Sequence, residues 1–174
     1  MVAFLTRMPA GIPGMVNRGF ASTVEPVSLT PFGVTGRPTT YGVPLVVDQT
    51  GGNVGNMRTV VAADTADLVY GLLVRPFPTT GANANDPLGT GTIAQQQNSG
   101  DVLRFGYMSV LLSGSTAAVK GGNVYIWTAA PSGSHITGGF ESTNPGASGI
   151  AIPGVFMGPA DANGNVEVSL NLIP

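Results

Sequence analysis

Short runs of apolar residues, separated by turn residues, occupy most of the chain after Pro44. The last run, residues 166–172, alternates strictly between aliphatic and polar side chains. A period of two is typical of a strand with one face in a core and the other in solvent. The run at residues 102–112 has apolar residues at both parities, which indicates a strand buried on both faces.

Further strands are predicted at residues 43–47, 58–63, 68–77, 123–128 and 150–157. The dipeptide Asn163-Gly164, just before the last run, is typical of tight hairpins. No segment has the apolar period of a convincing helix. The pattern therefore predicts an all-β protein, a jelly-roll-like β-sandwich or a barrel.

Residues 1–44 differ from this body because they have no usable period. Proline and glycine recur throughout the segment and exclude a helix of useful length, yet it is rich in apolar side chains. Ordering about 40 residues costs on the order of 40–80 kcal/mol. Offsetting that cost requires well over 1,500 Å² of apolar burial. We therefore expect an extended N-terminal arm, residues 1–44, that lies on the body, residues 45–174, or on a partner subunit.

Residues 78–100 form a long polar segment with no internal period. A loop of this length is uncommon inside a compact domain. It is either a mobile surface loop or an interface loop that becomes ordered on contact.

The composition favours a protein that works in an assembly. Charged residues make up only 9% of the chain, which is little for a free monomer. The predicted arm has a net charge of +2 and the body −4, because Arg7, Arg18, Arg37 and Glu25 are the ionised residues up to Pro44. Three dispersed arginines are a weak signal for nucleic acid, so no nucleic-acid partner is expected. The apolar runs are too short to span a membrane, and no signal peptide is recognisable, so a soluble protein without a membrane partner is expected.

Candidates for catalysis and metal binding are few. The chain has no cysteine and one histidine, His135, so a zinc site lacks ligands and no cofactor is expected. A Ser/His/Asp triad needs only spatial proximity, but no nucleophile-elbow motif is present. Residues 161–167 alternate acidic and amide side chains like part of a calcium loop, although the spacing fits an Asn-Gly hairpin better. We expect no enzymatic activity.

Several segments resemble the structural cement proteins of tailed bacteriophages. They are YGVPLV at 41–46, LVYGLLVR at 68–75, GDVL at 100–103, KGGNVYIW at 120–127 and GVFM at 154–157. The resemblance implies a capsid decoration protein on the outer surface of the virion, made in the cytoplasm of a host bacterium, that clamps neighbouring major capsid proteins. It also implies a homodimer or homotrimer with a jelly-roll or related fold, or alternatively a β-tulip-like decoration-protein fold.

The resemblance carries no motif-level binding residues, so the contact residues are inferred from the arm itself. Arginines could meet an acidic capsid surface, and phenylalanines could act as apolar anchors or cover the protein's own body. The expected contacts are Phe4, Arg7, Arg18, Phe20, Phe32 and Arg37. The alternative functions are a head-fibre or tail structural component and, with less support, a small β-sandwich hydrolase.

Overall fold

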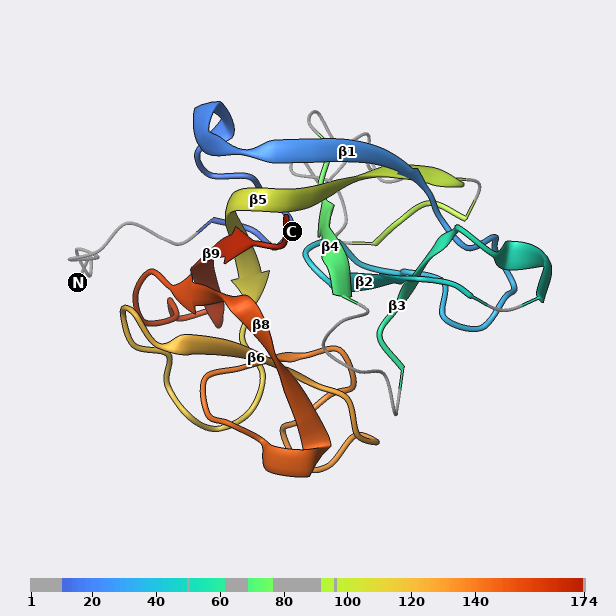
Figure 1. Cartoon of the computed structure of the whole chain (residues 1–174). Coiled ribbons are helices and arrows are strands. Elements are labelled where there is room, and N and C mark those ends of the chain that lie inside the picture. The colour runs from blue at the N-terminus through green and yellow to red at the C-terminus, as the bar shows by residue number, and fades with distance from the viewer. Residues whose placement is uncertain (1–10, 50, 62–68, 77–91, 96, 174) are drawn as a thin grey trace, which may run out of the picture.

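The computed structural model describes residues 11–49, 51–61, 69–76, 92–95 and 97–173. Nine antiparallel strands in these residues form one sheet (Figure 1). The strands are β1 (Thr23–Ser28), β2 (Pro44–Val47), β3 (Met57–Thr59), β4 (Val69–Val74), β5 (Ser99–Leu111), β6 (Asn123–Trp127), β7 (Phe140–Glu141), β8 (Gly149–Phe156) and β9 (Asn165–Asn171). The helical elements of the described chain are three short 3-10 turns, η1 (Gly19–Ala21), η2 (Gly51–Asn53) and η4 (Gly146–Ser148).

The strand order is β3-β2-β4-β5-β9-β8-β6-β7, and β1 pairs with β5 outside this path. The sheet curls into a half-barrel, with β5 between the β2–β4 part and the β6–β9 part (Figure 1). The predicted all-β barrel or sandwich class is therefore confirmed.

The main core lies inside the curl, and a smaller apolar cluster lies on the other face of β4 and β5. Alternate residues of β4 serve the two sides, because Leu72 packs in the main core and Leu73 in the smaller cluster. The smaller cluster is completed by Leu29, Tyr41 and Leu45, which come from the N-terminal part of the chain. β5 is buried on both faces at Val102 and Leu103 and again at 108–110, whereas Phe105 and Leu111 are 41% and 47% exposed. The burial that the apolar run at 102–112 predicts is therefore found for only part of the strand.

The last strand follows its pattern as well. Val166, Val168 and Leu170 of β9 are buried in the main core. Before β9, Asp161 Oδ1 accepts hydrogen bonds from the backbone N–H groups of Asn163 and Asn165, both at 2.9 Å. This oxygen therefore shapes the predicted turn.

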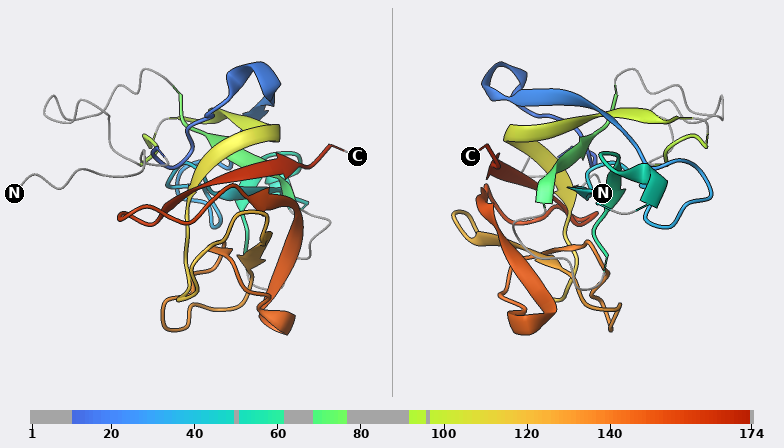
Figure 2. Two further views of the ribbon diagram at one scale, coloured as in Figure 1. Left: turned by 90° about the vertical axis from the view of Figure 1, so that its left-hand side faces the viewer. Right: turned by 45° about the vertical axis from the view of Figure 1, so that its right-hand side comes forward.

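The described part of the N-terminal segment lies on the chain's own sheet. The amides of Gly14 and Asn17 donate to the carbonyls of Ser109 and Tyr107 in β5, at 2.8 and 3.0 Å. Further along, β1 pairs with β5 from Ser99 to Phe105. Figure 2 shows β1 beside β5 from two more directions. Residues 1–10 of the predicted arm, and residues 78–91 and 96 of the predicted long loop, lie outside the described residues. The division of the chain at residue 44 stays a prediction.

Between these two pairings the chain passes directly over Gly106 of β5. A Cβ at Gly106 would lie 2.7 Å from the Ser22 Cβ and 2.8 Å from the Ala21 carbonyl oxygen. Gly106 also has φ of 128°, a conformation that other residues rarely adopt. The crossing of the N-terminal segment therefore requires glycine at this position.

Gly106→Ala is expected to lower the free energy of unfolding by roughly 1–3 kcal/mol, because it adds a backbone clash to an unfavourable φ. Urea denaturation measures the loss, and tryptic cleavage at Arg18 reports whether the segment has come off β5. Gly19→Ala is the matched control, since a Cβ there meets nothing within 4 Å. Equal stability of both variants would contradict the crossing.

Candidate partner-binding surface

A polar network holds the chain in place just before η1. Asn17 Nδ2 donates to Ser109 Oγ and to Glu167 Oε1, both at 3.0 Å. Arg18 Nη2 lies 3.1 Å from Glu167 Oε2, and its guanidinium lies over the Tyr107 ring, 4.2 Å from the centroid. The network joins the N-terminal segment to β5 and β9, so the two residues that precede η1 are held against the sheet.

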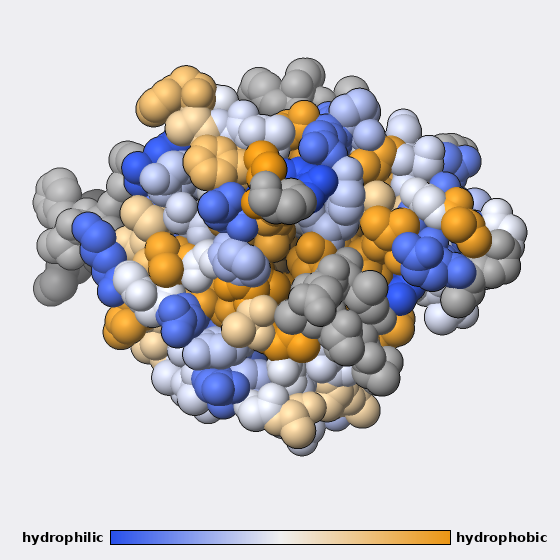
Figure 3. Space-filling model, in the orientation of Figure 1, coloured by the Kyte–Doolittle hydropathy of each residue, from blue (hydrophilic) through white to orange (hydrophobic). Residues whose placement is uncertain are grey.

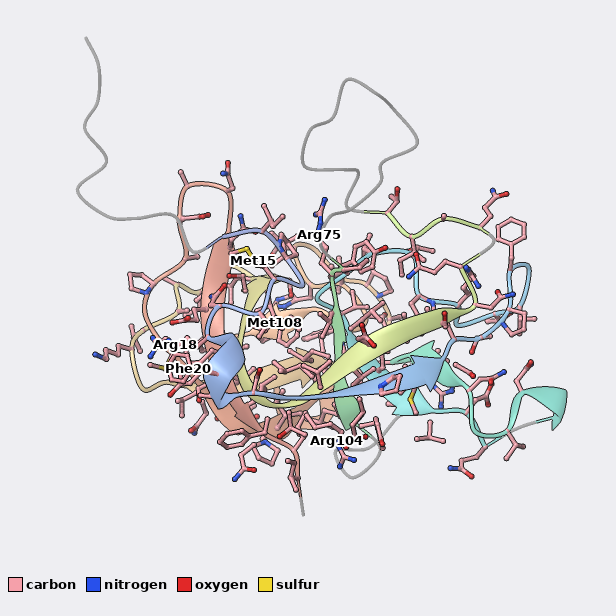
Figure 4. All side chains as sticks on the ribbon, turned by 90° about the horizontal axis from the view of Figure 1, so that it is seen from above. Met15, Arg18, Phe20, Arg75, Arg104 and Met108 are labelled. Atoms are coloured by element: carbon pink, nitrogen blue, oxygen red, sulfur yellow. The ribbon has the colours of Figure 1, made fainter. Side chains whose placement is uncertain are left out.

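Phe20 projects from η1 into solvent. It is 95% exposed, the highest value among the exposed large apolar side chains of the described chain. Phe105, which pairs with Thr23 of β1, is 41% exposed at the same end of the sheet. Figure 4 shows Arg18 and Phe20 side by side at η1, which lies at the upper left of Figure 1, and Figure 3 shows apolar atoms projecting there. Phe20 and Phe105 are called the Phe20 tip below.

Two loops beyond the other end of β1 carry further exposed apolar side chains. Phe32 is 59% exposed, Val34 37% and Val54 64%. The loops that carry them flank β3, because Thr30 N–H donates to the Met57 carbonyl and Thr59 N–H to the Gly36 carbonyl. They lie at the right-hand end of Figure 1. Phe32, Val34 and Val54 are called the Phe32 tip.

Arg37 fixes the base of the Phe32 tip. Its guanidinium reaches from the loop after Phe32 to the segment before β5. It donates to the carbonyl oxygens of Thr30 at 2.8 Å, Ala94 at 3.0 Å, Gln95 at 3.2 Å and Gln97 at 2.8 Å, and to Asn98 Oδ1 at 3.4 Å. A planar guanidinium suits such a fan of acceptors. Arg37 is therefore engaged inside the chain.

The structure separates the predicted contact residues into two groups. Arg18 and Phe20 lie at one tip, and Phe32 and Arg37 lie at the other. The two arginines have partners within the chain, whereas the two phenylalanines are exposed. Phe4 and Arg7 lie outside the described residues.

Some members of the tips were missed by sequence reasoning. Phe105 lies in an apolar run that predicts burial, but the register of β1 against β5 shifts between Thr23 and Val24, next to this residue. Val54 sits among glycines in a segment that predicts only a turn. The one sequence signal that could have marked Val54 is its apolar side chain in a glycine-rich turn segment, where little burial is expected.

His135 belongs to a structural cluster. Its Nδ1 lies 2.9 Å from Glu141 Oε1, and the same oxygen accepts a hydrogen bond from Ser113 Oγ at 2.9 Å. The Trp127 ring stacks on the imidazole at 4.3 Å. A triad needs the imidazole between the hydroxyl and the carboxylate, whereas here the carboxylate lies between the other two groups. The arrangement ties the turn at 132–135 to β7.

Two further features concern the described parts of the chain, a cluster of metal ligands and a membrane-spanning helix. No group of three or more His, Cys, Asp or Glu side chains there could hold a metal ion. Among the same residues, no helix has the length and apolar character needed to cross a bilayer.

Comparisons with known proteins point to a phage capsid. The family model of the XM1 gp53 minor capsid protein matches residues 1–170. A chain from the structure titled "The capsid of Myoviridae Phage XM1" has a TM-score of 0.70 and 19% sequence identity, over 97% of this chain and 95% of that chain. No curated protein sequence matches. The structural likeness supports the fold, and the family model covers nearly the full sequence.

Arg37→Ala is expected to lower the free energy of unfolding by about 2–3 kcal/mol, because charge-assisted hydrogen bonds to several carbonyls are lost together. Arg37→Lys should recover only part of this loss, since an ammonium cannot reproduce the fork. Arg18→Ala is the comparison, with an expected loss within about 1 kcal/mol for an exposed ion pair. Chemical denaturation measures all three, and a loss for Arg37→Ala no larger than for Arg18→Ala would refute the clamp.

Proposed function

Because the chain belongs to the XM1 gp53 minor capsid protein family, a family of phage capsid structural proteins, we propose that it is a cement protein. In this proposal it binds the outer surface of the mature head and clamps neighbouring major capsid proteins. It acts as a homo-oligomer and has no catalytic role.

The observation that carries the proposal is the presence of two separate apolar tips on one chain. Joining neighbouring capsid proteins takes two contacts for each copy, one with a capsid protein and one with a second copy that holds the neighbour. The Phe20 tip precedes β1 and the Phe32 tip follows it, and the six residues of β1 span about 20 Å. Both tips are held by intrachain hydrogen bonds, which lowers the entropy lost when they bind.

The low charge of the surface supports the same role. An accessory protein on a lattice makes many weak contacts at once, and their effective concentration raises the overall affinity. Each contact can therefore be small and apolar. The Phe32 tip is the surface assigned to the major capsid protein, because its three apolar side chains are contributed by two loops braced against β3.

Phe32→Ser and Phe20→Ser are each expected to reduce the heat protection of capsids that lack the native protein. Loss of an aromatic anchor costs about 2 kcal/mol per contact, or roughly thirtyfold in Kd. Phe32→Ser should weaken co-sedimentation with the shells, whereas Phe20→Ser should bind them but protect less. Both variants should unfold like the wild type, because exposed side chains contribute little to stability.

Val119→Ser is the matched control, since Val119 is 63% exposed and belongs to neither tip. It should bind and protect like the wild type. Protection by either Phe variant at the wild-type level would remove that tip from the clamp. A protein bound at a few copies per particle, instead of in proportion to the capsid protein, would indicate a head-fibre or tail component.

A further inference from the structure

An apolar groove of about 210 Å³ lies on the sheet away from the Phe20 tip. Its walls come from the N-terminal segment, from the residues before β2 and from the loop before β7. Leu111 and Ile136 in its lining are about half exposed. The lining residues used here are Pro13, Tyr41, Arg75, Leu111, Ile136 and Phe140.

The chemistry of the groove suits an aromatic ring. A cavity of about 150 Å³ lined by apolar side chains is enough to hold benzene, so a phenyl group fits the available volume. The Arg75 guanidinium lies 5.8 Å from the Tyr41 ring centroid, so a cation and an aromatic ring both line the groove. Burial raises the pKa of Tyr41, so its phenol stays neutral and places no negative charge in the groove.

We propose that the groove receives Phe20 from a second copy of this chain. Phe20 is an aromatic side chain that η1 holds almost completely in solvent, so a partner can take it up with little loss of intrachain contact. Figure 4 shows Phe20 and Arg75 well apart, on different elements. A contact between the Phe20 tip and the groove therefore joins two molecules. The role of this contact in the particle rests on the proposed function, because it would join two copies bound to the same capsid.

The available area sets the strength of this contact. With roughly 200 Å² for a Phe side chain, the exposures of Phe20 and Phe105 give about 270 Å² of apolar surface. A stable interface buries about 800 Å² per partner, of which somewhat more than half is apolar. The tip supplies more than half of that apolar share. Two copies should therefore meet weakly in solution and more stably on a lattice that holds them side by side.

Disulfide trapping can capture such a transient contact, and the chain has no cysteine of its own to interfere. Gly19→Cys places a thiol beside Phe20 without removing the ring, because a Cβ at Gly19 meets nothing within 4 Å. Gly19→Cys and Ile136→Cys proteins of different mass are mixed as free proteins and oxidised. The expected result is about tenfold more cross-linked heterodimer than from Val119→Cys mixed with Ile136→Cys, a ratio equivalent to about 1.4 kcal/mol. Thermal melts of the reduced variants confirm that each is folded.

Two results would overturn the proposal. Equal yields from the Gly19→Cys and Val119→Cys mixtures, at any level, would show that the tip has no preference for the groove. Efficient cross-linking of Gly19→Cys with itself, without heterodimer, would place two tips against each other instead. The assay contains no capsid, so its failure leaves the shell-protection result standing, and a failure to protect shells leaves the cross-linking result standing.

The double variant Gly19→Cys/Ile136→Cys then defines the symmetry of the contact. A reciprocal two-fold contact stops at a covalent dimer, whereas a head-to-tail contact continues to a closed ring or a longer series. Either product supports the pairing of tip and groove, and an absence of both contradicts it.

Discussion

Backbone hydrogen bonding along β5 is the interaction on which the rest of the structure depends. This one strand pairs with β1, β4 and β9, and residues 14–17 add further bonds at Tyr107 and Ser109. Because N–H and C=O groups of a buried strand must be satisfied, the N-terminal segment is a structural partner of the sheet. Gly106 permits that arrangement by letting the chain pass over β5 without a side chain in its path.

The crossing also determines what the surface presents. A free arm would lose backbone entropy of about 1–2 kcal/mol per residue on meeting a partner. In this chain, residues 11–44 are already ordered in the folded protein, through β1 and through the contacts of Asn17, Arg18 and Arg37. Their entropy is therefore lost during folding and not on binding. Phe20 consequently projects into solvent from a turn, η1, that is ordered before a partner binds. Pro26 lies within β1 and has no N–H to donate, which makes strand-by-strand addition at β1 less favourable than contact through side chains.

The sequence pattern predicts those parts of the fold that depend on local alternation. The strand at β9 and the hairpin before it follow from their periodicity and from Asn163-Gly164. The position of residues 11–28 could not be predicted, because their partners in β5 lie 71–95 residues away along the chain and an apolar segment without a period fits many surfaces. Likewise, Phe20 and Leu29 look alike in sequence, yet one is almost fully exposed and the other is buried in the smaller cluster.

The distribution of charge explains why recognition falls to apolar side chains. Two arginines predicted to meet an acidic partner are used within the fold, since Arg18 pairs with Glu167 and Arg37 binds carbonyl oxygens. Arg104, which was not among the predicted contacts, lies near Glu25 and over the Tyr70 ring. An ion pair already formed within the chain must be broken before its members can bind a partner, so little electrostatic free energy remains for docking. Apolar contacts need no such exchange. A protein with few charges, most of them engaged internally, is thus suited to recognition by shape and burial at its tips.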